Sequence, residues 1–206
     1  MEIKDAITDL AELERMYPQP AALSVRKVTE KLTAAYRSLI EASPFLAVAT
    51  CGAEGLDCSP RGDTAGFVRV ADEQTLLLPE RRGNNRIDTL RNLVADPRIA
   101  LLFLVPGIQE TFRVNGRAAI SGNRELCDSF TVNGNAPRVV IVVQIESAYF
   151  QCGRAILRSE LWNPSLYRSR ADLPTAGTML AEATSGQEGG AAYDAALPER
   201  MRTTLY

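Results

Sequence analysis

Runs of apolar residues and alternating apolar and polar positions predict a mainly antiparallel β-protein. In 110–122, Phe112, Val114 and Gly116 alternate with polar neighbours, which is typical of a strand with one buried face. The apolar run RIALLFLVP (98–106) should lie in the middle of the sheet. Strands are predicted at 45–51, 56–62, 67–71, 75–79, 98–106, 110–122 and 138–150. Because short turns join them, the pattern favours a small antiparallel barrel with helices packed outside it.

Helical spacing is confined to the ends of the chain and to short connections. Ile3, Ile7, Leu10 and Leu13 predict an amphipathic helix over 2–15, and a second helix is expected from Ser24 to Ile40. Shorter helices are expected at 84–95, 123–132, 152–158, 175–184 and 191–203. We therefore divide the chain into an N-terminal helical extension (1–43), a core (44–164) and a C-terminal tail with short helices (165–206).

Composition narrows the class of protein. The 206 residues carry a net charge of −2, so broad electrostatic attraction to nucleic acid is not expected. No apolar run approaches the ~20 residues of a membrane span, and the N-terminus lacks an apolar signal core. The four cysteines have no CxxC spacing, which favours reduced thiols. We expect a cytoplasmic protein that binds neither membrane nor nucleic acid.

The chain contains no histidine, and this excludes several kinds of catalytic and metal site. There can be no Ser-His-Asp or Cys-His machinery and no histidine ligand for zinc or haem. The other ligand types are not clustered in the sequence, so no metal site is assigned. If the protein is an enzyme, a cofactor should supply the reactive group, and no catalytic side chain is identified.

The stretch Leu77–Leu93 (LLPERRGNNRIDTLRNL) predicts a strand, a cationic glycine turn and the start of a helix. Free backbone N–H groups, the helix dipole and arginine side chains in that order make a binding place for a phosphate. The candidates here are Arg82, Asn84, Asn85 and Arg86. The alternative is a solvated arginine-bearing turn.

Three further polar segments are candidates for ligand contacts. Ser59, Pro60, Arg61 and Gly62 follow a strand, where Arg61 could hydrogen-bond a ring carbonyl or a phosphate and Gly62 allows close approach; a charged turn is the alternative. Thr111 and Arg113 lie on the polar face of a strand. Gln151, Cys152 and Arg154 follow the last long strand, where a thiol beside arginine could have a lowered pKa, although a packed cysteine is more common.

Taken together, these segments resemble the FMN-binding split-barrel superfamily, and more narrowly its bacterial branch related to pyridoxamine 5'-phosphate oxidase. The matching motifs are FLAVATCGAEGLDCSPRGD, FVRVADEQTLLLPERRGNNRIDTLRNL, DPRIALLFLVPG, ETFRVNGRA and YFQCGRA, which span residues 44–158. The resemblance implies a six-stranded antiparallel split barrel. It also implies a homodimer that holds FMN at its interface.

The resemblance also implies roles for the candidate residues. The strand with Ser59 to Arg61 would run along the isoalloxazine ring and ribityl chain, and the turn from Arg82 to Arg86 would hold the phosphate. Residues near Thr111 and Arg113, and from Gln151 to Arg154, would approach the flavin from one subunit or the other. The flavin would accept a hydride at N5, and Arg61 or a nearby N–H would stabilise the reduced anionic ring.

The chain departs from the oxidase proper, which uses arginine and histidine residues near its C-terminus to hold pyridoxal phosphate. There is no histidine here, and 165–206 lacks that pattern. The implied function is an FMN-dependent oxidoreductase acting on an unassigned small-molecule substrate. The alternatives are a non-catalytic protein that stores or senses flavin and a structural domain in which the arginine turn is only surface.

Overall fold

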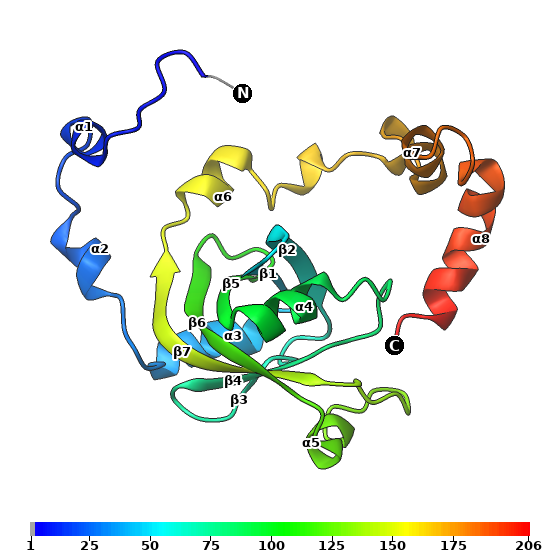
Figure 1. The fold of residues 1–206 in the computed structure, drawn as a ribbon, viewed down its shortest axis with the longest axis horizontal. Helices are drawn as coiled ribbons and strands as arrows, with labels where there is room; N and C mark the ends of the chain where they lie inside the picture. Colours follow the sequence, from blue (N-terminus) through cyan, green and yellow to red (C-terminus); the bar gives the residue numbers. More distant parts are fainter. Residues whose placement is uncertain (1–2) are drawn as a thin grey trace.

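Seven strands form one antiparallel sheet in the computed structural model, which describes residues 3–206 (Figure 1). They are β1 (Phe45–Gly52), β2 (Gly55–Gly62), β3 (Arg69–Val70), β4 (Thr75–Pro79), β5 (Arg98–Leu104), β6 (Thr111–Ser121) and β7 (Val140–Gln151). Their order in the sheet is β2-β1-β5-β6-β7-β4-β3. The apolar strand β5 is an interior strand between β1 and β6, as its sequence predicts.

The antiparallel sheet with peripheral helices is confirmed, and it has the seven strands that the sequence pattern predicts. The six-stranded barrel that the resemblance implies is wrong, because the sheet is open. The short strand β3 adds to the free edge of β4 and makes a seventh strand. Within residues 3–206, β2 and β3 remain edge strands that do not pair with each other. The first half of the long strand β7 pairs with both β4 and β6, and a bulge between Asn115 and Gly116 interrupts the β6–β7 register. The sheet therefore curls in a split-barrel-like way without closing.

Alternate side chains of the strands make the core. Leu46 and Val48 on β1, Leu101 and Phe103 on β5, and Val114 on β6 are each no more than 1% exposed. This period-two burial is the pattern that the apolar and polar alternation predicts. The polar face is left for solvent or for a ligand.

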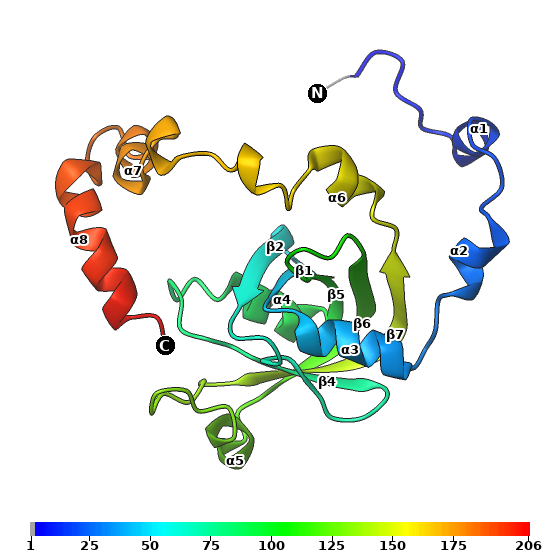
Figure 2. The same cartoon turned by 180° about the vertical axis from the view of Figure 1, so that it is seen from behind.

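The helices lie outside the sheet or at its ends. They are α1 (Leu10–Arg15), α2 (Ala22–Arg26), α3 (Ala34–Ala42), α4 (Asp88–Ala95), α5 (Arg124–Asp128), α6 (Arg154–Ser159), α7 (Ala176–Ala183) and α8 (Gly190–Thr203), with 3-10 turns at Pro164–Leu166 and Arg170–Asp172. Helix α3 covers the curled sheet in Figure 2, where Ile40 is fully buried and the Tyr36 ring packs on Phe112 at 5.0 Å. Helix α4 buries Leu93 against the core.

The two helices expected near the N-terminus differ from the structure. The helix predicted over 2–15 begins only at Leu10, and residue 2 lies outside the described residues. The helix predicted from Ser24 to Ile40 is interrupted, because the Thr29 amide donates to the Ala148 carbonyl and the Thr29 carbonyl accepts from the Ala148 amide. Thr33 then caps α3, accepting a hydrogen bond from the Tyr36 amide at 3.2 Å. A pairing with β7 therefore replaces one turn of helix.

The ends of the chain extend away from the sheet. In Figures 1 and 2, α1 and α2 lie on one side of it and α7 and α8 on the other, and α1, α2 and α8 bury none of their residues. No helix in residues 3–206 has both the length and the hydrophobicity needed to cross a lipid bilayer.

Candidate functional site

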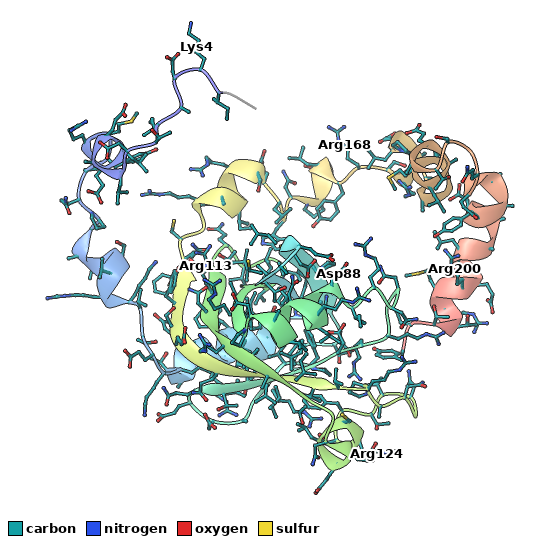
Figure 3. All side chains as sticks on the ribbon, viewed as in Figure 1. Lys4, Asp88, Arg113, Arg124, Arg168 and Arg200 are labelled. Atoms are coloured by element: carbon teal, nitrogen blue, oxygen red, sulfur yellow. The ribbon has the colours of Figure 1, made fainter. Side chains whose placement is uncertain are left out.

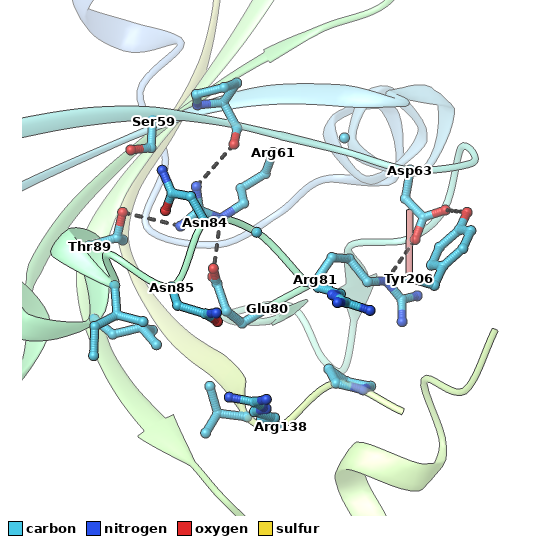
Figure 4. Close-up of a pocket in the computed structure, with 18 of the residues that line it drawn as sticks. Ser59, Arg61, Asp63, Glu80, Arg81, Asn84, Asn85, Thr89, Arg138 and Tyr206 are labelled. Carbon is cyan, nitrogen blue, oxygen red and sulfur yellow. Dashed lines mark hydrogen bonds and ion pairs between the residues drawn. The ribbon is translucent and has the colours of Figure 1, made fainter. Parts of the chain in front are cut away.

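A cavity of about 1210 Å3 lies where four segments meet, between the end of β2 and the turn that follows β4 (Figure 4). The end of β2 and the residues after it (59–64) form one wall, and the turn between β4 and α4 (80–90) forms another. The loop 135–139 and the last two residues, Leu205 and Tyr206, complete the lining. Strand β2 positions Asp57, Ser59 and Arg61 on one face, because residues two apart along a strand point the same way.

Arg61 is the centre of a hydrogen-bonded network in this cavity. Its Nε donates to Glu80 Oε2 at 3.1 Å, and its Nη2 donates to Thr89 Oγ1 at 3.1 Å. Thr89 Oγ1 donates to Asp57 Oδ2 at 2.6 Å, and Ser59 Oγ also donates to that carboxylate. The guanidinium plane is thus held in one orientation by Glu80 in the turn after β4 and by Thr89 on α4.

The charge of Glu80 is disfavoured at this position. Burial raises the pKa of Glu80 above its usual value, the nearby Asp57 raises it further, and Arg61 only partly offsets both effects. Only 16% of the Arg61 side chain and 20% of the Glu80 side chain are exposed. The pair therefore lies in a region where electrostatic interactions are stronger than in water.

A second ion pair closes another part of the cavity. Arg81 Nε donates to Asp63 Oδ2 at 2.8 Å, and the two side chains are 14% and 2% exposed. Burial acts to raise the pKa of Asp63, but hydrogen bonds from Tyr206, the Thr64 amide and Arg81 outweigh it, so the pKa is lowered. The Tyr206 hydroxyl donates to Asp63 Oδ1 at 2.8 Å, and this bond raises the tyrosine pKa.

The arginine turn between β4 and α4 presents backbone N–H groups. Asn85 and Ile87 both have positive φ angles, of 60° and 55°, and for a β-branched residue such as Ile87 this conformation is strained. Within residues 3–206, the amides of Gly83, Asn84 and Asn85 donate no hydrogen bond to the protein. Helix α4 begins at Asp88, later than the expected start at 84, because Ile87 is left-handed.

The arginines of this turn differ in how they are engaged. Arg86 pairs with Asp88 at 2.7 Å on the surface, with 74% of its side chain exposed. That hydrogen bond raises the pKa of Arg86. The Arg82 side chain has no hydrogen bond or ion pair within residues 3–206. Arg82 is therefore available to an anion without losing an internal partner.

The cavity brings together eight of the residues predicted from the sequence: Ser59, Pro60, Arg61, Gly62, Arg82, Asn84, Asn85 and Arg86. It does not include the other five, which lie at the far end of the β6–β7 pair: Thr111, Arg113, Gln151, Cys152 and Arg154. In that second group Thr111 is the strand partner of Gln151, and Arg113 donates to the Tyr149 hydroxyl at 3.1 Å. Figure 3 shows Arg113 beside β7, apart from Asp88 at the start of α4.

Several residues that shape the cavity are not among those predicted from the sequence: Asp57, Asp63, Glu80, Arg81, Thr89, Arg138 and Tyr206. Asp57 could have been found, because it lies two residues before Ser59 on the same strand face. Tyr206 could not, since 143 positions separate it from Asp63. In the described part of the chain, no three Cys, Asp or Glu side chains are grouped to hold a metal ion.

The family model described as pyridoxamine 5'-phosphate oxidase matches residues 32–152, more than half of the chain. The structure of HupZ from Group A Streptococcus has 19% sequence identity and a TM-score of 0.50, and the match covers 59% of this chain and 94% of HupZ. This likeness supports the split-barrel-like fold.

Two further solved structures share less of the fold. A putative pyridoxamine 5'-phosphate oxidase from Lactobacillus delbrueckii has 22% identity and a TM-score of 0.46, covering 59% of this chain and 95% of its own. An F420 reductase has 19% identity and a TM-score of 0.43, and the match covers 58% of this chain and 98% of the reductase. No curated protein sequence matches this chain.

Proposed function

Because the chain belongs to the pyridoxamine 5'-phosphate oxidase family, we propose that it binds FMN in the cavity and acts as an FMN-dependent oxidoreductase on a small-molecule substrate. One observation carries the proposal. Two segments predicted to contact FMN, residues 59–62 and 82–86, come from separate elements and line the same cavity. A flavin needs both a phosphate site and a wall beside its ring, and this arrangement offers both.

The turn at 82–86 suits the phosphate of FMN. Among the described residues 3–206, Arg82 has no hydrogen-bond or ion-pair partner and the amides of Gly83, Asn84 and Asn85 donate to no group. Arg86 is exposed. The N-terminus of α4 lies directly after this turn, so its dipole adds positive potential. Asp88 and the phosphate would compete for Arg86, and we expect Arg86 to bind the more highly charged phosphate.

The β2 wall suits the ring of the flavin. Pro60 and Gly62 are exposed on β2 and line the cavity beside Ser59 and Arg61. Arg61, held by Glu80 and Thr89, can place positive charge beside the N1/O2 edge of the ring. When bound, FMN would supply the hydride-accepting chemistry, and these side chains would orient it and stabilise its negative charge.

We propose that a second copy of the chain completes the site, as a homodimer. The five predicted residues at the end of the β6–β7 pair lie outside this cavity and would reach the flavin of the partner subunit. Residues 44–164 would form the FMN-binding core, with 1–43 and 165–206 as extensions. A cytoplasmic location remains part of this proposal, in keeping with four free cysteines.

One observation favours a second candidate function, a non-catalytic protein that stores or senses flavin. The cavity carboxylates Asp57, Asp63 and Glu80 are each engaged by hydroxyl or guanidinium donors. A carboxylate that acts as a general acid or base would first have to give up one of these hydrogen bonds, and this favours binding without turnover.

The absorbance spectrum of the purified protein tests the first step. Flavin bands that release FMN on denaturation support binding, and a colourless protein that does not take up added FMN contradicts it. Steady turnover, in which NADH or NADPH reduces the bound flavin and an added acceptor reoxidises it, supports the oxidoreductase. Binding without turnover over a broad set of donors and acceptors supports the storage function.

A further inference from the structure

The C-terminal segment 163–206 leaves the core and then contacts the cavity through its last two residues. After α6, residues 163–203 run along the outside of the molecule, and α8 buries none of its side chains. Figure 1 shows α7 and α8 standing apart from the sheet, with the end of the chain turning back towards it. Leu205 and Tyr206 then line the cavity.

This segment is fastened to the core at its two ends. At the first, Trp162 Nε1 donates to the Ile108 carbonyl at 2.8 Å. At the second, the Tyr206 hydroxyl donates to Asp63 Oδ1 at 2.8 Å. Between these two residues, the hydrogen bonds in the described structure are local or join α7 to α8, as between Thr175 and Asp194. The segment 163–206 is thus a strap that crosses the outside of the core.

Asp63, which accepts the hydrogen bond from Tyr206, is itself held in place by the protein. Asp63 is held by Arg81, whose Nη1 also donates to the Phe130 carbonyl at 2.7 Å. The Arg81 guanidinium lies 5.5 Å from the centre of the Tyr206 ring, within reach of a cation–π interaction. Figure 4 shows the ring beside Asp63 and Arg81 at the edge of the cavity. A ring that moved away from this pair would uncover Arg81 and widen the cavity.

We propose that Tyr206 is a positioning residue that closes the cavity, and that its release from Asp63 and Arg81 opens the route by which the ligand leaves. The identity of that ligand as FMN rests on the proposed function. The proposal that Tyr206 closes the cavity does not depend on FMN, because it is argued from the contacts of Tyr206 with Asp63 and Arg81. This role lies in the tail, outside the residues 32–152 that match the family model.

Flavin exchange measures the consequence of closure. We expect Tyr206→Ala to raise the FMN dissociation rate about tenfold, the scale of a lost hydrogen bond to a charged group, without slowing association. Tyr206→Phe keeps the ring over Arg81 and should give a smaller increase. The control is Tyr193→Ala, which removes the same ring from α8, where it packs on Arg200. If FMN dissociates equally faster from Tyr206→Ala and Tyr193→Ala, or no faster from Tyr206→Ala than from wild type, Tyr206 does not close the cavity.

Labelling of arginine with phenylglyoxal tests the closure without any flavin. In ligand-free protein, Tyr206→Ala should raise the modification rate of Arg81 several-fold, measured on peptides by mass spectrometry. Arg82 is exposed already and serves as the internal control. An unchanged Arg81 rate would overturn the closure even if FMN binds. If the wild type does not bind FMN, the proposed function fails, and a selective rise at Arg81 still supports a closing role for Tyr206.

Discussion

Arg61 and Glu80 form a largely buried ion pair inside the cavity, with Nε and Oε2 separated by 3.1 Å. The pair joins the end of β2 to the turn after β4, so it fixes the distance between the two walls proposed to hold FMN. Burial raises the pKa of Glu80 despite this partner. The folded protein therefore binds a proton at Glu80 more tightly than the unfolded chain does.

The first prediction concerns Glu80→Gln and pH. A raised folded-state pKa means that the contribution of Glu80 to stability is fully present below about 4.5 and is lost as pH rises through the folded-state pKa. Gln lacks this ionisation and keeps an acceptor for Arg61. The free energy of unfolding of the variant, relative to wild type, should thus rise with pH in this window.

Urea denaturation at a series of pH values measures this difference. Glu73→Gln is the matched control, since Glu73 pairs with Lys31 on the surface and is 58% exposed. A difference for Glu80→Gln that stays constant with pH would contradict the assigned cause. The control should change little at any pH, because exposed ion pairs contribute little.

The second prediction is that Arg82→Ala and Arg86→Ala weaken FMN binding while the fold survives. A charge-assisted contact with the phosphate contributes about 1.5–3 kcal/mol, so each loss should be measurable by titration of the apoprotein. In the part of the chain that the structure describes, Arg82 has no hydrogen-bond or ion-pair partner and Arg86 pairs only with Asp88 at the surface, so the midpoint of thermal unfolding should move little. Arg124→Ala is the control, on α5 with 91% of its side chain exposed. Unchanged flavin content in both variants would refute the phosphate site.

The third prediction concerns Asp63→Asn, which removes one partner of a buried ion pair. At pH 7 we expect a loss of about 3 kcal/mol in the free energy of unfolding, because Arg81 is left buried without its counter-charge. The pKa of Asp63 is lowered, so its contribution is present above about 3.8 and is lost as pH falls through the folded-state value.

The measurement is again chemical denaturation, at pH 7 and at decreasing pH. The difference between wild type and Asp63→Asn should shrink as the pH falls below 3.8. Asp128→Asn breaks a surface pair with Arg124 and should have a small effect throughout. An equal loss in the two variants would mean that the burial of the Asp63–Arg81 pair does not matter.

The sequence predicts the strands well because their information is local. Apolar residues at every second position, as at Leu46 and Val48, specify both the strand and its buried face. The helix over Ser24–Ile40 fails for the opposite reason. The pairing of Thr29 with Ala148 joins positions 119 apart, and no local pattern records it.

The same distinction separates the parts of the site. Ser59 and Arg61 are predictable from one strand, and Arg82 to Arg86 from one turn. The left-handed conformation of Ile87 is not predictable, since β-branched residues disfavour it. Tyr206 and Asp63 meet only because the strap brings the end of the chain back to the cavity.

The last prediction concerns Gly116, at the bulge between β6 and β7. A Cβ at this position would overlap the carbonyl oxygen of Gln144, so the two strands would have to separate. We expect Gly116→Ala to cost about 1–3 kcal/mol in the free energy of unfolding, the range for overpacking. Gly122→Ala is the matched control, because nothing lies within 4 Å of the Cβ it would add.

The bulge also links the fold to the proposed site. It lies between the half of β7 that pairs with β4 and the half that ends at Gln151. We expect the bulge to set the direction of the β7 end at Gln151. Gly116→Ala should therefore weaken FMN binding in the dimer by more than the loss of folding stability accounts for. Titration of FMN at a temperature where both alanine variants remain folded measures this. Equal affinities for Gly116→Ala and Gly122→Ala would show that the bend serves packing alone.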